Sequence, residues 1–497
     1  MLLGMMSLFI VMPHLSSNQE VYGVYAICSS LTVFFSYADI GFVTSGQKFA
    51  AESCIKKDKE TELDILGFTS LILLAFLVCI SIAILYLSTN PSVLISDISS
   101  DNINIATSLL IILACSSPIF CFQRICQMVY AVRLSDYYYQ IIQIVGNILK
   151  ILSVFYFFGK GRYDIVGYYF TLQIISAIGL IVAFIFAKVR FDVSFWNILK
   201  HLKFKRSVYD MLSSLAYATL FGSVCWVLYY ELDNMVIAKL LGASAVAIYV
   251  AAFFVLSYFR NFFSILYSPF TARFNYFTAK NDIEGLNSFF KFIIEFFFPI
   301  TIIPILTMSI FSGPFVSSWV GPEYAISSDV LSVFLFGIIL TFISTPSGIY
   351  ITSRQKNSAL YISSGIIVLI YWGGIFLTYK TLGVISFAIM KSAGLLFSTF
   401  YLFWIVFKLM RDSKLIFLFQ MLCKYVVPVL CCVCISLLTK PYLDITKGFT
   451  HMLKNVLLFA SVCMLSYLFF LPFSRIHRDK VRYFYIELKK RIWKFNE

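Results

Sequence analysis

Ile65–Leu87 reads ILGFTSLILLAFLVCISIAILYL and carries no charged side chain. A helix rises about 1.5 Å per residue, so this run is long enough to cross a hydrocarbon core of about 30 Å. Similar runs recur along a chain that is 60% hydrophobic and only 13% charged. These runs are apolar all round, whereas barrel strands would alternate polar and apolar residues. The sequence therefore predicts an all-α polytopic membrane protein.

The apolar runs predict about 14 transmembrane helices. We expect them near residues 1–15, 22–46, 65–87, 105–128, 138–158, 163–187, 211–237, 243–268, 289–311, 327–349, 358–379, 383–407, 416–438 and 449–472.

The basic residues between these spans predict the orientation of the chain. About 28 of them fall in one set of loops and the tail, and about 7 in the opposite set. By the positive-inside rule, both termini of this multi-pass protein lie in the cytoplasm. This distribution also explains the net charge of +14 without a nucleic-acid partner. The basic tail 473–497 has apolar residues at helical spacing, which favours an amphipathic helix on anionic lipids.

The loop before Ile65–Leu87 reveals an internal repeat. At an offset of 224 residues the chain resembles itself through one apolar helix and the polar loop that follows, and a nearby offset relates Arg133 to Arg354. The matching pairs at offset 224 are Tyr25 and Tyr249, Phe35 and Phe259, Lys56 and Lys280, Asp58 and Asp282, and Glu60 and Glu284. Agreement that continues through a polar loop indicates a duplication.

The repeat predicts two pseudo-symmetric six-helix lobes around a central cavity, with two further helices at the C-terminus. Each half has an even number of helices, so both enter the membrane in the same direction, as in transporters that work by alternating access. The predicted parts are an N-lobe at 1–187, a basic linker at 188–210, a C-lobe at 211–410, two helices within 411–472 and the tail at 473–497.

Basic residues inside predicted spans are candidates for binding an anion, because a cation in hydrocarbon costs roughly 2.5–3.5 kcal/mol. The sequence places Lys150, Arg260, Lys391 and Lys424 in such spans. Lys150 lies about 12 Å from the nearer interface, beyond the reach of snorkelling. We expect a cationic substrate cavity that includes Arg260, Lys150 and Lys391, and Arg124 near one end of its span.

Polar residues at helical spacing accompany two of these cations. Three polar residues precede Lys150, two serines flank Arg260, and one serine is the repeat equivalent of Arg260. These predicted cavity-lining residues are Gln140, Gln143, Asn147, Ser257, Ser264 and Ser36. Hydrogen bonding between helices is the alternative explanation for the uncharged ones.

Four acids complete the set of charged residues in or near the spans. They are Asp39, Asp233, Glu231 and Glu295. Each is a candidate for a gating ion pair, for ion coupling, or for a structural partner of a nearby base, because burial raises the pKa of a carboxyl group. The sequence leaves these three roles open.

No pattern in the sequence points to catalysis. The four histidines are dispersed, and the twelve cysteines have no metal-binding or disulfide spacing. No phosphate loop or nucleophile elbow is present in the sequence. We expect no metal, no cofactor and no enzymatic activity.

Two segments carry a resemblance to a known family. Tyr22-Gly23-Val24-Tyr25 leads to Ala38-Asp39-Ile40-Gly41-Phe42, and Leu232–Gly242 leads to Ile248-Tyr249. In these motifs the chain resembles the Wzx-type O-antigen flippases of the multidrug/oligosaccharidyl-lipid/polysaccharide (MOP) exporter superfamily. The resemblance implies that the protein flips undecaprenyl-pyrophosphate-linked sugar repeat units to the outer leaflet. It also implies a polysaccharide polymerase and a chain-length regulator as partners, besides anionic membrane lipids.

Three other functions remain open at this point. A lipid II flippase of the same superfamily is similar, but those proteins carry arginines in the first helix and residues 1–15 have none. A drug/cation antiporter has less need of a cationic interior. A membrane polysaccharide polymerase or ligase would act on the same lipid-linked substrate, but such enzymes carry a long external loop, and the external loops expected here are short.

Overall fold

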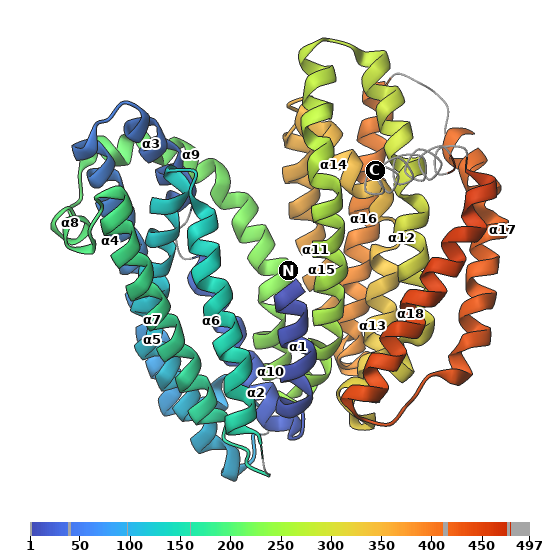
Figure 1. Cartoon of the computed structure of the whole chain (residues 1–497), viewed down its shortest axis with the longest axis horizontal. Coiled ribbons are helices and arrows are strands. Elements are labelled where there is room, and N and C mark those ends of the chain that lie inside the picture. The colour runs from blue at the N-terminus through green and yellow to red at the C-terminus, as the bar shows by residue number, and fades with distance from the viewer. Residues whose placement is uncertain are drawn as a thin grey trace, which may run out of the picture. The chain divides into compact units, whose positions relative to one another are not determined.

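The computed structural model describes residues 2–37, 41–96, 98–159, 161–410, 416–474 and 478. Within these ranges the regular structure is entirely helical (Figure 1). The expected all-α fold is therefore confirmed. The chain divides into two compact units, Met1–Val250 and Ala251–Glu497. The lobe boundaries predicted from the repeat, which begin the second lobe at 211, stay a prediction.

In its described residues the first unit contains ten α-helices, the two short helices η1 and η2, and the start of an eleventh α-helix. Their bounds are α1 Leu2–Leu15, α2 Gln19–Tyr37, α3 Phe42–Ile55, α4 Lys59–Thr89, η1 Pro91–Val93, α5 Ser100–Val132, α6 Asp136–Phe157, α7 Ile165–Phe191, α8 Phe195–Lys200, α9 Arg206–Trp226, the π-helical η2 Val227–Glu231, α10 Asp233–Leu241 and the beginning of α11 Ala243–Ala279.

The second unit contains the rest of α11 and seven further α-helices. They are α12 Ile283–Trp319, η3 Pro322–Tyr324, α13 Ala325–Ile338, α14 Thr341–Ser353, α15 Ser358–Leu382, α16 Ile385–Met410, α17 Ile416–Thr439, η4 Lys440–Tyr442, α18 Phe449–Phe470 and η5 Leu471–Phe473. The predicted tail at 473–497 lies outside the described residues apart from Phe473, Ser474 and Arg478.

Ten helices in the described part of the chain are long and apolar enough to cross a membrane. The pair α13 and α14, bent by 46°, would make an eleventh span. The remaining predicted spans coincide with helices that fall short of this test. The span predicted at 22–46 is divided between α2 and α3, and Gly41 before α3 has a left-handed φ of 78°. The span predicted at 211–237 is divided among α9, the π-helical turn η2 and α10.

The two halves share the same turns, which supports the predicted duplication. Before α4, Lys57 has φ 59° and Asp58 caps the helix by accepting a hydrogen bond from the Thr61 N–H. At the same offset, before α12, Asn281 has φ 55° and Asp282 accepts from the Gly285 N–H. The capping aspartates have nearly equal backbone angles, φ −89° and ψ 85° against φ −84° and ψ 83°. Asx capping explains why the polar loop matches as well as the helices.

Four long helices form most of the first unit. Helices α4, α5, α6 and α7 run side by side in Figure 1, and α5 contacts the other three. The start of α11 also belongs here, because a Cβ at Gly23 of α2 would lie 1.9 Å from the Ala243 carbonyl oxygen. Only glycine permits so close an approach, which gives a structural reason for the glycine in the Tyr22-Gly23-Val24-Tyr25 motif.

Helix α12 is the centre of the second unit. It contacts α13, α14, α17 and α18, and much of its length is buried although it contains Pro299, Pro304 and Pro314. In Figure 1 the helices α17 and α18, coloured orange-red, lie beside each other in this unit. Helix α16 packs against α13, α14 and α15. The second unit is thus a bundle around the largely buried helix α12.

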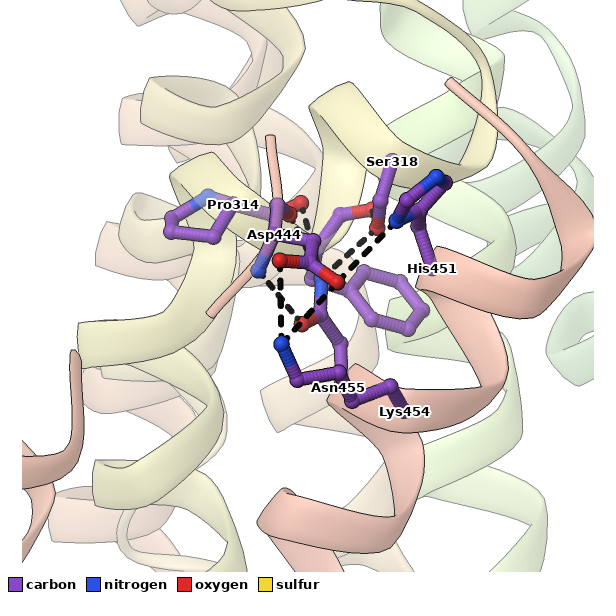
Figure 2. Close-up of polar contacts among 7 residues, drawn as sticks. Pro314, Ser318, Asp444, His451, Lys454 and Asn455 are labelled. Carbon is purple, nitrogen blue, oxygen red and sulfur yellow. Dashed lines mark hydrogen bonds and ion pairs between the residues drawn. The ribbon is translucent and has the colours of Figure 1, made fainter. Parts of the chain in front are cut away.

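A buried asparagine fixes the loop between α17 and α18 to the end of α12 (Figure 2). The Asn455 side chain is 2% exposed, donates to the Asp444 carbonyl oxygen at 2.8 Å and to Ser318 Oγ at 2.9 Å, and accepts from the Asp444 N–H at 2.9 Å. The Asp444 carboxylate accepts from His451 Nδ1 and Lys454 Nζ, both at 3.0 Å. These two bonds hold the pKa of Asp444 below its usual value.

We predict that Asn455→Ala lowers the free energy of unfolding by about 1–3 kcal/mol, because it leaves the Asp444 backbone groups and the Ser318 hydroxyl without these bonds. The measurement is the thermal unfolding midpoint of the purified full-length protein. Ser461→Ala, an exposed change on the same helix, is the matched control and should change the free energy by less than about 0.5 kcal/mol. Equal midpoints for the two variants would contradict the role of Asn455.

Candidate functional site

Lys391 is a fully buried cation inside the second unit. It lies on α16 with 0% of its surface exposed. Its Nζ lies 4.9 Å from the ring centroid of Phe253 on α11 and 5.0 Å from that of Tyr371 on α15. A desolvated cation over an aromatic ring gains about 2 kcal/mol, which offsets part of a desolvation cost of several kcal/mol. The Lys391 amine therefore lies beside aromatic rings of two other helices, away from water.

Arg260 lies on the same face of α11 as the ring that contacts Lys391. Phe253, Ser257, Arg260 and Ser264 follow one another at spacings of 4, 3 and 4, so they share one face of the helix. Seven residues separate Phe253 from Arg260, a rise of about 10 Å. Ser257 and Arg260 are half-buried and Ser264 is exposed. This face of α11 therefore carries Arg260 about two helical turns from Phe253, the ring that Lys391 of α16 contacts.

The predicted polar stripe of the first unit lies on the surface of α6. Lys150 and Gln143 are half-buried, while Gln140 and Asn147 are exposed. Large apolar side chains on the other faces of α6 are exposed too, among them Leu152, which is 57% exposed. Helix α6 contacts only α1, α5 and α7 extensively. The stripe is thus a surface of amide and ammonium donors and not part of the core of its unit.

Arg124 makes a local contact near one end of α5. Its side chain is half-buried and donates to Gln127 Oε1 at 3.4 Å, one turn along the same helix. The adjacent Gln123 carbonyl accepts from the Tyr139 hydroxyl of α6 at 3.4 Å. Arg124 therefore lies near the junction of α5 and α6, the helix that carries Lys150.

Glu295 and Lys424 form an ion pair between α12 and α17. Lys424 Nζ donates to Glu295 Oε1 at 2.6 Å, and the Tyr425 hydroxyl donates to the same oxygen at 2.9 Å. The Lys424 side chain is 40% exposed and the Glu295 side chain is 18% exposed. The sequence left three roles open for Glu295: a gating ion pair, ion coupling, or a structural partner of a base. The ion pair with Lys424 matches the structural role.

Asp233 is the buried acid of the first unit. It begins α10, is 1% exposed, and accepts a hydrogen bond from the Tyr249 hydroxyl of α11. Tyr249 is the repeat equivalent of Tyr25. Glu231, at the end of η2, is half-buried. Asp39 lies outside the described residues, and Ser36 lies in α2 with a side chain that the structure does not describe.

The structure thus groups the predicted residues into three places. Lys391 of α16 contacts Phe253, which shares a face of α11 with Arg260. Lys150 and Arg124 belong to neighbouring helices of the first unit, and Glu295 binds Lys424. The sequence supported Lys391 less strongly than Lys150 and Arg260, because no stripe of polar residues accompanies Lys391 on its own helix. Its contacts are rings on two other helices, which no periodicity reveals. Among the described residues no group of three or more His, Cys, Asp or Glu side chains could hold a metal ion.

The fold is similar to that of three solved membrane transporters. An inward-facing multidrug resistance transporter of the MATE family, from the MOP superfamily, superposes with a TM-score of 0.70 at 13% identity, over 83% of this chain and 96% of that one. The lipid II flippase MurJ, in an inward closed conformation, gives 0.65 at 14% identity, over 95% and 99%. An outward-facing MATE family transporter gives 0.52 at 16% identity, over 82% and 95%.

These likenesses show that the chain has the fold of MOP superfamily transporters. Neither a protein-family model nor a curated protein sequence matches the chain. At 13–16% identity the shared fold does not show which substrate this chain binds. The substrate is inferred from the charged residues of the site.

The Glu295–Lys424 pair predicts a charge-reversal effect on stability. We expect Glu295→Lys and Lys424→Glu each to lower the thermal unfolding midpoint, and the double reversal to recover part of the loss, with a coupling energy of about 1 kcal/mol. The more open pair Glu323 and Lys447, separated by 3.6 Å, is the control and should couple by less than about 0.5 kcal/mol. Additive single effects at positions 295 and 424 would rule out a structural ion pair.

Proposed function

We propose that the chain is a flippase that moves undecaprenyl-pyrophosphate-linked oligosaccharide repeat units, of the O-antigen or capsule type, from the inner to the outer leaflet by alternating access. The observation that carries the proposal is the fully buried Lys391 of α16. It contacts Phe253, which lies on the same face of α11 as Arg260. A second support is the shared fold with the lipid II flippase MurJ over 95% of this chain.

The charge of the passenger follows from the charge of the site. A cation held without water attracts an anion strongly, because the local dielectric constant is low. Pyrophosphate offers several oxygens to ammonium and guanidinium donors, and an arginine can bind two of them at once. In this proposal Lys391 and Arg260 of the second unit hold the pyrophosphate, and the Lys150 stripe and Arg124 are a separate group of candidate donors in the first unit.

The lipid part of the passenger is supported by the extent of the structural likeness. The MATE family transporters match 82–83% of this chain, whereas the lipid II flippase matches 95%. Large apolar side chains of α17 and α18 are exposed, for example Phe419, Leu438 and Met464, each at least 70%. Such surfaces suit hydrocarbon, whether of the bilayer or of a polyprenyl chain.

The remaining acids bear on how transport would be driven. Glu295 is occupied by Lys424, so Asp233 with Tyr249 is the better candidate for gating or ion coupling, with Glu231 beside it in sequence. We also propose an inner-membrane location with both termini in the cytoplasm, on the strength of the basic loops. A polysaccharide polymerase and a chain-length regulator would then receive the product on the outer side.

Two alternatives remain within the same fold, and one lies outside it. A lipid II flippase would carry the same pyrophosphate, and a drug/cation exporter would carry a positive passenger that Lys391 and Arg260 repel. The similar solved structures are transporters and a flippase, which supports transport over a polymerase or ligase activity.

The test is to remove the gene and identify the lipid-linked sugar that collects. We predict that undecaprenyl-pyrophosphate-linked repeat units accumulate on the cytoplasmic leaflet and that surface polysaccharide is lost. Arg260→Glu should fail to restore surface polysaccharide, because a carboxylate repels the pyrophosphate, while Arg260→Lys restores most of it. Membrane levels of both variants are measured in parallel.

Three outcomes would contradict the proposal. Accumulation of lipid II would identify the other flippase, and single repeat units on the outer leaflet would identify a polymerase. Full restoration of surface polysaccharide by Arg260→Glu would remove Arg260 from the binding site.

A further inference from the structure

A second cationic site lies in the second unit, where α14 ends and α15 begins. A cavity of about 490 Å³ opens there. Three basic side chains line it, Arg354, Lys356 and Lys408, of which the two lysines are exposed and the arginine is half-buried. Its apolar wall includes Ile362, Ile405 and Leu409. The volume is in the range of 300–1,000 Å³ that ligand pockets in proteins commonly have.

The chain supplies no counter-charge to this cavity within its described residues. No acidic side chain lines it, and none of the ion pairs found there includes any of the three basic side chains. The cavity also borders Ser358, the first residue of the 25-residue helix α15, where the helix dipole favours an anion.

Comparison of the two halves shows that an acid pairs with the arginine of this turn in the first half, whereas no acidic side chain among the described residues lines the cavity in the second. The turn at Arg133 has the same form as that at Arg354, since Leu134 and Gln355 both have left-handed φ angles of 52° and 57°. In the first half, however, Arg133 binds Glu62 at 2.6 Å and packs over Phe191. The position equivalent to Glu62 at the offset of 224 is Leu286, which is fully buried.

Two positions of the turn itself also become more positive in the second half. Ser135 and Asp136 of the first half correspond to Lys356 and Asn357 of the second. The second half therefore gains one base and lacks two acids around an otherwise shared backbone. An anion from outside the chain would restore the balance that Glu62 provides in the first half.

The surroundings place the cavity where hydrocarbon meets water. Trp404 is 56% exposed on α16, and Lys408 Nζ lies 5.8 Å from its ring centroid. Tyr401, which lines the cavity, stacks on Phe397 at 6.3 Å. Ile362 is 50% exposed on α15. Tryptophan and tyrosine next to lysine are typical of a membrane interface, so a ligand here meets charge at one end and hydrocarbon at the other.

We propose that this cavity binds an anionic phospholipid, with its phosphate among Arg354, Lys356 and Lys408 and one acyl chain along Ile362 and Ile405. Basic pockets between membrane helices recognise lipid headgroups in this way. The site is separate from Lys391 and Arg260, so the inference holds whatever the chain transports.

The test measures binding of phosphatidylglycerol to the purified full-length protein by native mass spectrometry, with phosphatidylcholine as the neutral lipid. We expect phosphatidylglycerol to bind preferentially and the affinity to fall roughly fivefold for each cation removed in Arg354→Gln, Lys356→Gln and Lys408→Gln. The matched control is Lys56→Gln, Lys57→Gln and Lys203→Gln, which removes the same charge from exposed positions elsewhere and should leave the affinity within twofold.

Lys408→Gln alone guards against misfolding of the triple variant, because Lys408 is exposed and its loss should still weaken binding about fivefold. Three results would overturn the proposal. The control variant could lose as much affinity as the pocket variant, the single variant could bind as tightly as the parent, or glycerol phosphate could displace the lipid at equal concentration. The last result would identify a site for a soluble phosphate instead of a lipid.

Discussion

The positive charge of Lys391 is the constraint on which the functional account depends. A lysine with no exposed surface, between the rings of Phe253 and Tyr371, is costly to insert and gains only part of that cost from the aromatic rings. An apolar residue of similar volume would pack there at least as stably. In the proposed function a ligand of opposite sign offsets part of this cost, and Arg260, on the face of α11 that carries Phe253, is the second cation of the proposed site.

The duplicated halves have the same turns but treat their charges differently. In the first half Arg133 is neutralised by Glu62. In the second half Glu295 neutralises Lys424, whereas the cations around Arg354 have no acid of the described chain beside them. The predicted duplication explains the shared backbone, and the difference between Glu62 and Leu286 leaves the second half with one acid fewer at this turn.

The sequence was sufficient for the class of fold and for local geometry. Uninterrupted apolar runs predict spans because a bilayer demands them, and Asp58 and Asp282 predict matching turns because a capping carboxylate acts on its own helix. It was insufficient wherever the contact is long-range. The rings beside Lys391 come from other helices, and Glu295 meets Lys424 across 129 residues. The division between α2 and α3 and the π-helical turn η2 also escaped prediction, since no proline marks either break.

The most direct test of the account is flipping by the purified protein in vesicles. A fluorescent polyprenyl-pyrophosphate-linked oligosaccharide is placed in one leaflet, and a membrane-impermeant quencher reports the fraction that crosses. The account predicts rapid equilibration with the parent protein and with Lys391→Arg, and at least about tenfold slower movement with Lys391→Met, since loss of a charge-assisted contact costs about 1.5–3 kcal/mol. Equal rates for Lys391→Met and the parent, or no flipping above that of protein-free vesicles, would contradict it.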